Sequence, residues 1–280
     1  MNGFLLLDKE KDWTSFDVVK KVKGITGERK IGHSGTLDPL ATGLLVLALG
    51  QGTKLLEYLI GCDKAYEVVA RFGSVSDTFD AAGEVTLVSD GEVCPADLQK
   101  AVEGFVGEIE QVPPKYSALK IAGRRACDLV REGKEVEMKS RSVRIERFEI
   151  LEFAWPEVSF SVKCSTGTYI RSLIHDLGAK LEVGAYVKEL RRTRVGKFFS
   201  MHSCKVEELN NNVEQRLISM EEMARSFPFI ELNDEEWQGL QNGHTVESNK
   251  VEQGELKMAF YKGEMVGVLK AGMKFEKKIL

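Results

Sequence analysis

The chain has 280 residues, of which 43% are hydrophobic and 29% are charged, and its net charge at pH 7 is −4. This composition is that of an ordinary globular protein, and the length is enough for one or two domains. No apolar stretch approaches the roughly 20 residues that cross a bilayer, and the amino terminus turns charged at Asp8 without a basic segment, which excludes a membrane span and a signal peptide.

Hydrophobic periodicity predicts an irregular mixture of strands and helices along the first 200 residues. The run Thr14-Ser15-Phe16-Asp17 resembles a capping box and predicts a helix start, and Pro95 is typical of a first helical residue. The predicted strands are 3–7, 44–49, 66–72, 141–153 and 158–164, and the predicted helices are 18–23, 53–60, 96–103, 124–131 and 168–181. Because the two kinds of element do not alternate regularly, the pattern favours an α+β fold over a doubly wound parallel sheet.

The pattern changes after Phe199. Residues 206–224 predict one helix, which ends before Pro228. The remaining segment holds short apolar runs separated by Gly243, Gly254, Gly263, Gly267 and Gly272. Such a pattern is typical of a small all-β module. We therefore expect two domains, a large α+β domain over residues 1–226 and an all-β domain over residues 227–280.

Charged residues are distributed unevenly along the chain. Residues 207–280 carry 14 acidic and 9 basic side chains, whereas residues 1–206 carry 29 acidic and 30 basic ones. Lysines and arginines concentrate in residues 115–147 and 188–197. Such clusters suit a path of RNA phosphates, but a charge run is more often a solvated face, so charge alone leaves RNA binding open.

The cysteine and histidine content argues against disulfides and bound metal. The 5 cysteines are scattered, and no Cys-x-x-Cys occurs, which is typical of free thiols in a reducing cytoplasm. The 4 histidines show no metal-ligand spacing. We therefore expect a cytoplasmic protein that holds no metal.

The most informative segment is residues 32–43, Gly-His-Ser-Gly-Thr-Leu-Asp-Pro-Leu-Ala-Thr-Gly. It carries one carboxylate, Asp38, and the following Pro39 disfavours helical backbone at that position. The three glycines permit unusual backbone angles or the close approach of another chain segment. An acid held rigidly before a buried strand suits a nucleophile or a base. A turn whose aspartate caps a backbone N–H explains the spacing equally well, so spacing alone leaves both interpretations open.

This segment resembles the signature of the TruB family of tRNA pseudouridine-55 synthases, and the resemblance covers roughly residues 3–200 in the family's order. Further matching blocks are Gly50-Gln51-Gly52-Thr53-Lys54, Asp63-Lys64-Ala65-Tyr66, Ser76-Asp77-Thr78-Phe79-Asp80, Pro113-Pro114-Lys115-Tyr116-Ser117-Ala118-Leu119-Lys120, Gly167-Thr168-Tyr169-Ile170-Arg171-Ser172-Leu173 and Leu190-Arg191-Arg192-Thr193. The resemblance implies a mixed-sheet pseudouridine synthase catalytic domain followed by a PUA-like accessory RNA-binding domain.

The resemblance also implies an activity, the isomerisation of uridine to pseudouridine at position 55 in the T-loop of tRNA. This reaction breaks the C1′–N1 bond of the nucleoside, turns the uracil and rejoins it through C5. It needs neither redox chemistry nor a metal, so no cofactor is expected. The implied partner is the T arm of tRNA, and we expect a monomer.

The resemblance assigns a role to individual residues. Asp38 matches the catalytic carboxylate, Tyr66 the tyrosine that stacks on the flipped uracil, and Arg171 the arginine that pairs with the carboxylate and keeps it ionised. His33 matches a residue that helps to displace the uridine. The other matching residues near the substrate are Tyr169, Leu190, Lys9, Lys54 and Asp80. From spacing alone, a packed strand tyrosine and a helix-surface arginine would be the favoured interpretations of Tyr66 and Arg171.

Two other functions remain open at this level. One is a non-catalytic factor that binds or folds tRNA through its T arm, and the other is a synthase for a different RNA, including a guide-directed enzyme. A pure binder has no need for a carboxylate in its pocket, so Asp38 favours catalysis. The continuous amino-terminal match and the short carboxyl-terminal module favour a stand-alone tRNA enzyme.

Overall fold

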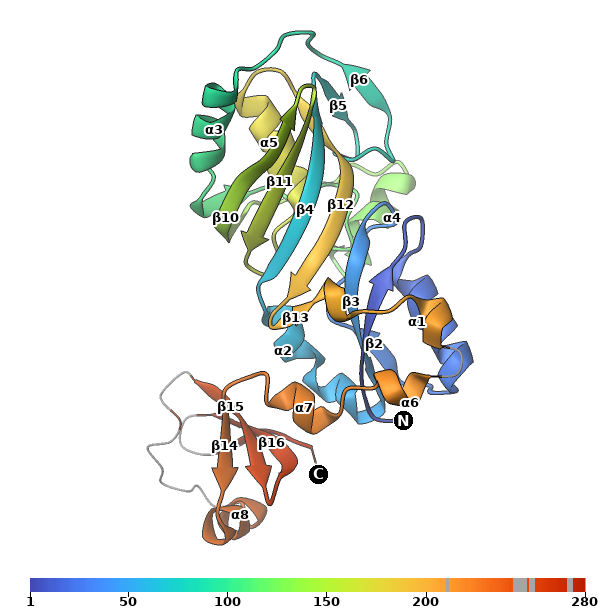
Figure 1. The fold of residues 1–280 in the computed structure, drawn as a ribbon, viewed down its shortest axis with the longest axis vertical. Coiled ribbons are helices and arrows are strands. Elements are labelled where there is room, and N and C mark those ends of the chain that lie inside the picture. The colour runs from blue at the N-terminus through green and yellow to red at the C-terminus, as the bar shows by residue number, and fades with distance from the viewer. Residues whose placement is uncertain (210–211, 244–250, 252–254, 271–273, 280) are drawn as a thin grey trace.

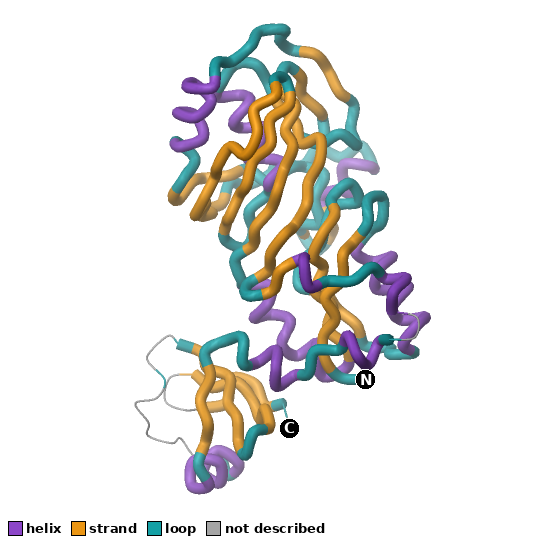
Figure 2. Tube along the Cα trace, in the orientation of Figure 1, coloured by secondary structure: helices purple, strands orange, loops and turns teal. Residues whose placement is uncertain are grey.

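The structure is a computed structural model that describes residues 1–209, 212–243, 251, 255–270 and 274–279. One large sheet occupies the amino-terminal part of the chain, and a smaller sheet forms the carboxyl-terminal part (Figure 1, Figure 2). The strands of the large sheet are β1 (Gly3–Lys9), β2 (Ile31–His33), β3 (Thr42–Leu49), β4 (Lys64–Phe72), β7 (Gly107–Gln111), β10 (Arg141–Ala154), β11 (Glu157–Cys164), β12 (Ala185–Val195) and β13 (Phe198–Phe199).

The large sheet has the strand order β1-β3-β12-β4-β11-β10-β7, with β2 beside β3 and β13 beside β12. All of these neighbours pair antiparallel except β3 and β12, which run parallel. Two short hairpins lie outside the large sheet, formed by β5 (Ser74–Ser76) with β6 (Val85–Leu87) and by β8 (Lys120–Ile121) with β9 (Arg124–Arg125). The predicted α+β class with a mixed sheet is confirmed.

Some helices pack on one face of the large sheet, and others surround the end of the sheet that contains β2 and β3 (Figure 1). The α-helices before the smaller sheet are α1 (Ser15–Thr26), α2 (Leu56–Gly61), α3 (Pro95–Glu103), α4 (Ala126–Arg131), α5 (Ile170–Lys180), α6 (Val213–Arg216) and α7 (Met220–Ala224). Helix α5 buries Leu173, Ile174 and Leu177 completely, in one cluster with Val68 of β4 and Phe160 of β11. The main core therefore lies between α5 and the centre of the sheet.

Most of the predicted elements are confirmed, with ends shifted by a few residues. The capping box at Thr14 is present, with Asp17 in the third helical position, and α1 begins directly after it. The helix predicted over 53–60 begins instead as a 3-10 helix, Gly50–Leu55, before α2. The helix predicted over 124–131 begins only at Ala126, because the two preceding arginines form strand β9.

The single helix predicted over 206–224 is wrong. The chain forms a 3-10 turn, Val206–Leu209, and then the separate helices α6 and α7. Between these two helices, the backbone N–H and C=O of Ile218 pair with those of Phe4 in β1, at 2.9 Å in each direction. This pairing with a distant edge strand holds the segment extended, and local periodicity carries no signal for it.

The carboxyl-terminal module is built on a four-stranded β-sheet, which confirms the expected all-β region, and its described residues add one helix that was not predicted. The strands are β14 (Phe229–Leu232), β15 (Leu256–Tyr261), β16 (Glu264–Lys270) and β17 (Lys274–Lys278), in that spatial order. Helix α8 (Asp234–Gln241) follows β14 and begins with a capping box between Asn233 and Glu236, the signal that could have predicted it. The predicted breaks at Gly254 and Gly272 lie outside the described residues.

The smaller sheet shares a hydrophobic core with the large one. Phe260 and Val268 of the smaller sheet are fully buried in one cluster with Leu44 and Val46 of β3, and Met223 of α7 belongs to the same cluster. Apolar side chains that pack in this way stabilise both partners by keeping their surfaces away from water. The four-stranded sheet begins near the predicted boundary at residue 227, but it does not stand apart from the rest of the chain.

Gly43 permits the contact that joins β3 to β12. A Cβ atom at this position would lie 2.3 Å from the carbonyl oxygen and 2.9 Å from the amide nitrogen of Arg192, and the residue has a φ of +96°. Both facts require glycine, because a side chain would clash with backbone atoms that cannot rotate away. The parallel register of Arg192 opposite Gly43 depends on this approach.

We expect Gly43→Ala to destabilise the protein by about 2–4 kcal/mol, because the added methyl group forces two paired strands apart. The matched control is Gly24→Ala, since Gly24 lies in α1 with no atom within 4 Å of the added methyl group. That change should raise stability by up to about 1 kcal/mol, because alanine favours helix. Urea unfolding of both variants measures the difference, and equal effects at the two glycines would contradict the strand-contact argument.

Candidate active site

A pocket of about 350 Å³ opens between the loop after β2, strand β4, the start of α5 and strand β12. Five of the predicted site residues line it: Asp38, Tyr66, Tyr169, Arg171 and Leu190. They come from four separate parts of the chain, so the fold brings together residues that are as much as 150 positions apart in the sequence. Tyr66 and Leu190 are each only 8% exposed, which gives the pocket an apolar floor.

The loop that carries Asp38 is held in place by polar side chains from outside it. Ser15 accepts a hydrogen bond from the Leu37 amide at 2.9 Å. Lys9, which is fully buried, donates from Nζ to the carbonyl oxygens of Trp13 at 2.6 Å and Pro39 at 3.2 Å. Burial lowers the pKa of Lys9 to about 8. The structure therefore places Lys9 behind the loop, as a support for it rather than as part of the pocket lining.

Arg171 joins two carboxylates at the inner end of the pocket. Its Nε lies 2.9 Å from Asp38 Oδ2, and its Nη1 lies 3.2 Å from Asp80 Oδ2. The Nε–H is not aligned for a hydrogen bond to Asp38, so this contact is an ion pair. Nη1 and Nη2 also donate to the carbonyl oxygens of Thr78 and Tyr116, each at 2.9 Å. The guanidinium is thus fixed by partners from three loops, and its side chain is only 5% exposed.

The Asp38 carboxyl is exposed only toward the pocket. Its side chain is 36% exposed, whereas the Asp80 side chain is 5% exposed. Desolvation raises the pKa of Asp38, and Asp80 raises it further, while Arg171 and Lys9 oppose the change. The net direction is upward, so the Asp38 carboxyl is harder to ionise than a carboxyl in water, although the guanidinium of Arg171 favours its charged form.

The direction of this pKa shift predicts how turnover depends on pH. An enzyme whose carboxyl must be ionised loses activity as pH falls through the raised pKa of that carboxyl, so the midpoint of the decline should lie above the ordinary value of 3.8. Single-turnover rates from pH 8 down to below the ordinary value of 3.8, with RNA affinity and folding measured at each pH, test this expectation. Burial lowers the pKa of His33, so this residue could also titrate as the pH falls. The control is the His33→Asn variant, whose rate should decline over the same acidic pH range if Asp38 causes the decline. A decline whose midpoint lies at or below the ordinary value of 3.8 would contradict the raised pKa.

The remaining predicted residues differ in how close they lie to the pocket. Tyr169 precedes α5 and is held by Gln111, which is fully buried and exchanges hydrogen bonds of 3.0 and 2.8 Å with the Tyr169 backbone. His33 ends β2, where its Nδ1 accepts from the Gly35 amide at 3.3 Å. Lys54 is not brought to the pocket: its Nζ donates to the carbonyl oxygen of Ile279 at 3.1 Å.

Arg192 is a site residue that sequence reasoning missed. The sequence places it in a basic cluster suited to phosphates, but its side chain is 1% exposed and lines the pocket. Leu190 and Arg192 lie two residues apart in β12, so period-2 alternation sends both side chains to the same face. That alternation was the available signal. Arg191 faces the other way and pairs with Asp8 at 3.0 and 2.6 Å.

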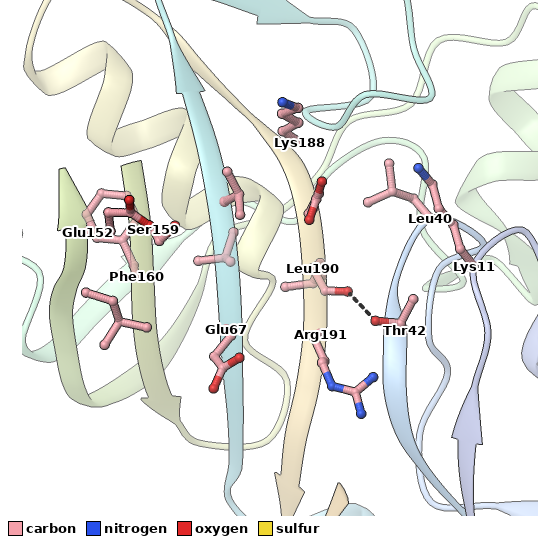
Figure 3. Close-up of a pocket in the computed structure, with 14 residues that line it drawn as sticks. Lys11, Leu40, Thr42, Glu67, Glu152, Ser159, Phe160, Lys188, Leu190 and Arg191 are labelled. Carbon is pink, nitrogen blue, oxygen red and sulfur yellow. Dashed lines mark hydrogen bonds between the residues drawn. The ribbon is translucent and has the colours of Figure 1, made fainter. Parts of the chain in front are cut away.

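A second cavity, of about 600 Å³, lies on the opposite face of the large sheet and is shown in Figure 3. It is lined by charged residues such as Lys11, Glu67 and Lys188. Thr42 and Leu190 meet at its floor, where Thr42 Oγ1 donates to the Leu190 carbonyl oxygen at 3.5 Å (Figure 3). Within the described part of the chain, no cluster of side chains suited to a metal ion occurs, and no helix is long and apolar enough to cross a membrane.

Comparison with known proteins identifies the class. The family model described as TruB family pseudouridylate synthase (N terminal domain) matches residues 23–170, and the model described as tRNA pseudouridylate synthase B C-terminal domain matches residues 171–227. The boundary between the two matched regions does not separate two structural domains. Strand β12 belongs to the second matched region, yet it lies in the middle of the large sheet that the first region forms.

Curated relatives and solved structures agree with these matches. The tRNA pseudouridine synthase B of Clostridium novyi is 42% identical, covering 81% of this chain and 79% of that protein. Those of Clostridium tetani and Aquifex aeolicus are each 36% identical over all of both chains. A chain of a Cbf5-Nop10-Gar1 complex superposes with a TM-score of 0.76 at 28% identity, covering 98% of this chain and 79% of that chain.

A second solved structure, an H/ACA RNP bound to a substrate RNA containing 2′-deoxyuridine, contains a chain that superposes with a TM-score of 0.75 at 25% identity, covering 99% of this chain and 85% of that chain. The mixed sheet, the pocket and these matches define an RNA-modifying isomerase of the pseudouridine synthase class. Within that class, the chain belongs to the TruB family of pseudouridylate synthases.

Proposed function

We propose that the protein acts on the uridine at position 55 in the T-loop of tRNA, with Asp38 as the catalytic carboxylate. The wider activity, isomerisation of uridine to pseudouridine in tRNA, follows from membership of the family. The observation that carries the proposal is the arrangement of Asp38 beside Arg171 at the inner end of a pocket that Tyr66 also lines. A non-catalytic tRNA-binding factor is not favoured.

The pocket supplies what the reaction needs. The C1′–N1 bond of the uridine must break, and a carboxylate at the sugar either bonds to C1′ or removes a proton from the ribose. Asp38 lines the pocket and is the residue to which we assign either step, and the ion pair with Arg171 would set the orientation of its carboxylate. Tyr66 provides an aromatic surface for the uracil, and Leu190 limits the access of water.

The uridine must leave its loop to enter this pocket, because a base stacked in a folded RNA is out of reach. His33 lies one residue before the pocket-lining segment that begins at Ser34, and this proximity supports a role for it in displacing the uridine. Arg141 also lines the pocket, and its guanidinium lies 4.7 Å from the centre of the Tyr169 ring. These residues would contact the flipped nucleotide and its phosphates.

The test is to map pseudouridine in tRNA incubated with the pure protein, and in an isolated T-arm hairpin. We expect one modified uridine, at position 55, in both RNAs. A hairpin with cytidine at that position should remain unmodified, and this RNA is the matched control. Pseudouridine at another site, or none at all, would overturn the assignment.

The carboxyl-terminal sheet is accessory in this proposal, as a PUA-like RNA-binding domain over residues 227–280 of a cytoplasmic monomer. Its acidic excess makes it a poor primary surface for phosphates. The shared core argues against testing this by deletion, because removal would expose Leu44, Val46 and their neighbours. Comparing the full chain on a T-arm hairpin and on whole tRNA is the better experiment: an accessory role predicts similar single-turnover rates but weaker binding of the hairpin.

A further inference from the structure

Arg192 is a buried arginine whose guanidinium donates hydrogen bonds to backbone oxygens. Its Nε donates to the Leu44 carbonyl oxygen at 2.8 Å, and its Nη2 donates to the Gly35 carbonyl oxygen at 3.1 Å. Neither bond uses Nη1, and the side chain also interacts with the Tyr66 hydroxyl. Among the described residues, no carboxylate forms an ion pair with it, in contrast to Arg171, which has two.

A buried and unpaired guanidinium is costly, since a charge removed from water needs a partner. The charged and titratable groups that influence Arg192 or are influenced by it are Tyr66, Asp38, His33, Lys64 and Lys9. Asp38 is the only one of these five groups that is a carboxylic acid. The residues that line the pocket include Lys64, Arg141, Arg171 and Arg192 but only one carboxylate, so the empty pocket has an excess of positive charge.

RNA phosphates do not account for Arg192. Its side chain is 1% exposed and lies at the floor of the pocket, beside the aromatic residue on which the base would stack. A phosphate would have to leave the RNA surface to reach it. Under the proposed function, the group that would come close to Arg192 is the flipped uracil itself.

We propose that Arg192 stabilises the uracil as an anion when it separates from the ribose, a role that rests on the proposed function. When the C1′–N1 bond breaks, its electron pair stays with N1, and the uracil becomes negatively charged. This holds for both routes open to Asp38. If its carboxylate bonds to C1′, the new C1′–O bond replaces the C1′–N1 bond, and if it removes the C2′ proton, the C2′–H electron pair forms a C1′=C2′ double bond. The negative charge on the uracil disappears when C5 bonds to C1′, because the Asp38 carboxylate then leaves C1′ or returns its proton to C2′. The C5 proton is afterwards replaced by a proton on N1, which gives neutral pseudouridine.

The test uses three variants and two substrates. Arg192→Met removes the charge at similar length, Arg192→Lys retains the charge without the planar fork, and Arg191→Met is the matched control on the other face of the same strand. The substrates are T-arm hairpins with uridine or 5-fluorouridine at the target position. Fluorine makes the base a more stable anion, so it leaves more easily without help from the protein.

We expect Arg192→Met to lower the single-turnover rate with uridine by about 100-fold, the size of effect seen on removing one group that stabilises a developing negative charge. With 5-fluorouridine, the loss of rate in Arg192→Met should shrink to about tenfold. The rate with this substrate is measured as the disappearance of 5-fluorouridine from the digested RNA. Arg192→Lys should retain more activity than Arg192→Met, and Arg191→Met should stay within about threefold of the unchanged protein. RNA affinity should change little in any of them.

Equal defects with the two substrates, or equal defects in Arg192→Met and Arg191→Met, would overturn the inference, because a merely structural role does not depend on the leaving group. Thermal unfolding of each variant shows whether the fold survives. If Arg192→Met does not fold, the loss of rate in Arg192→Lys is compared between the two substrates instead. A smaller loss with 5-fluorouridine than with uridine supports the inference, and equal losses overturn it. Failure of the unchanged protein to modify uridine would instead refute the proposed function.

Discussion

Replacing Asp38 by asparagine should abolish pseudouridine formation, with a loss of about 10⁴-fold or more in the single-turnover rate, because the amide is neither a nucleophile nor a base. RNA affinity should remain within about tenfold, which is 1.4 kcal/mol, since the pocket keeps its shape. The fold should survive, because burial disfavours the charged carboxyl that is removed and Arg171 remains paired with Asp80.

The matched control is Asp8→Asn, which removes a carboxylate of β1 that pairs with Arg191 away from the pocket. Its rate should stay within about threefold of the unchanged protein, because the partner is half exposed and a pair of that kind contributes little. Turnover of more than about 1% in the Asp38→Asn variant would end the assignment of Asp38 as the catalytic carboxylate.

Replacing Arg171 by alanine should impair both catalysis and folding. The rate should fall by about 10³-fold, because Asp38 loses the group that orients it. The free energy of unfolding should fall by about 3–5 kcal/mol, the size expected when one partner of a buried ion pair is removed and the other is left behind. Single-turnover kinetics and urea unfolding measure the two losses separately.

A second substitution shows which carboxylate causes the loss of stability. The Asp80 side chain is 5% exposed, whereas the Asp38 side chain is 36% exposed. Once Arg171 is removed, the unpaired charge of Asp80 should therefore lower the free energy of unfolding more than that of Asp38. Adding Asp80→Asn to Arg171→Ala should therefore restore more stability than adding Asp38→Asn. The opposite order of rescue, or no rescue by either change, would show that the arginine acts through its bonds to the Thr78 and Tyr116 carbonyl oxygens instead.

The sequence predicted the residues whose signals are local. Asp38 stands out because a proline and several glycines surround it, and the capping box at Thr14 marks the start of α1 correctly. The positions of Tyr66 and Arg171 in the pocket came from the family resemblance, since a strand tyrosine and a helix arginine have many possible surroundings. The structure places both at the pocket.

The features that the sequence did not predict depend on distant partners. The segment around Ile218 is extended because it pairs with Phe4, more than 200 residues earlier. Lys54 matched a family position near the substrate, yet its partner is the backbone of Ile279. Arg192 was grouped with its basic neighbours because charge runs are usually solvated, although the alternation of β12 already separated it from Arg191.

The shared core between the two sheets has a consequence for how the chain folds as it is synthesised. The outer face of β3 is covered in part by Phe260 and Ile279, and Lys54 of the adjoining 3-10 helix binds the Ile279 carbonyl oxygen. Because the amino terminus leaves the ribosome first, this face stays exposed to water until the strands of the smaller sheet have been synthesised. A chain that lacks those strands would therefore display an apolar surface and would be prone to associate with other chains.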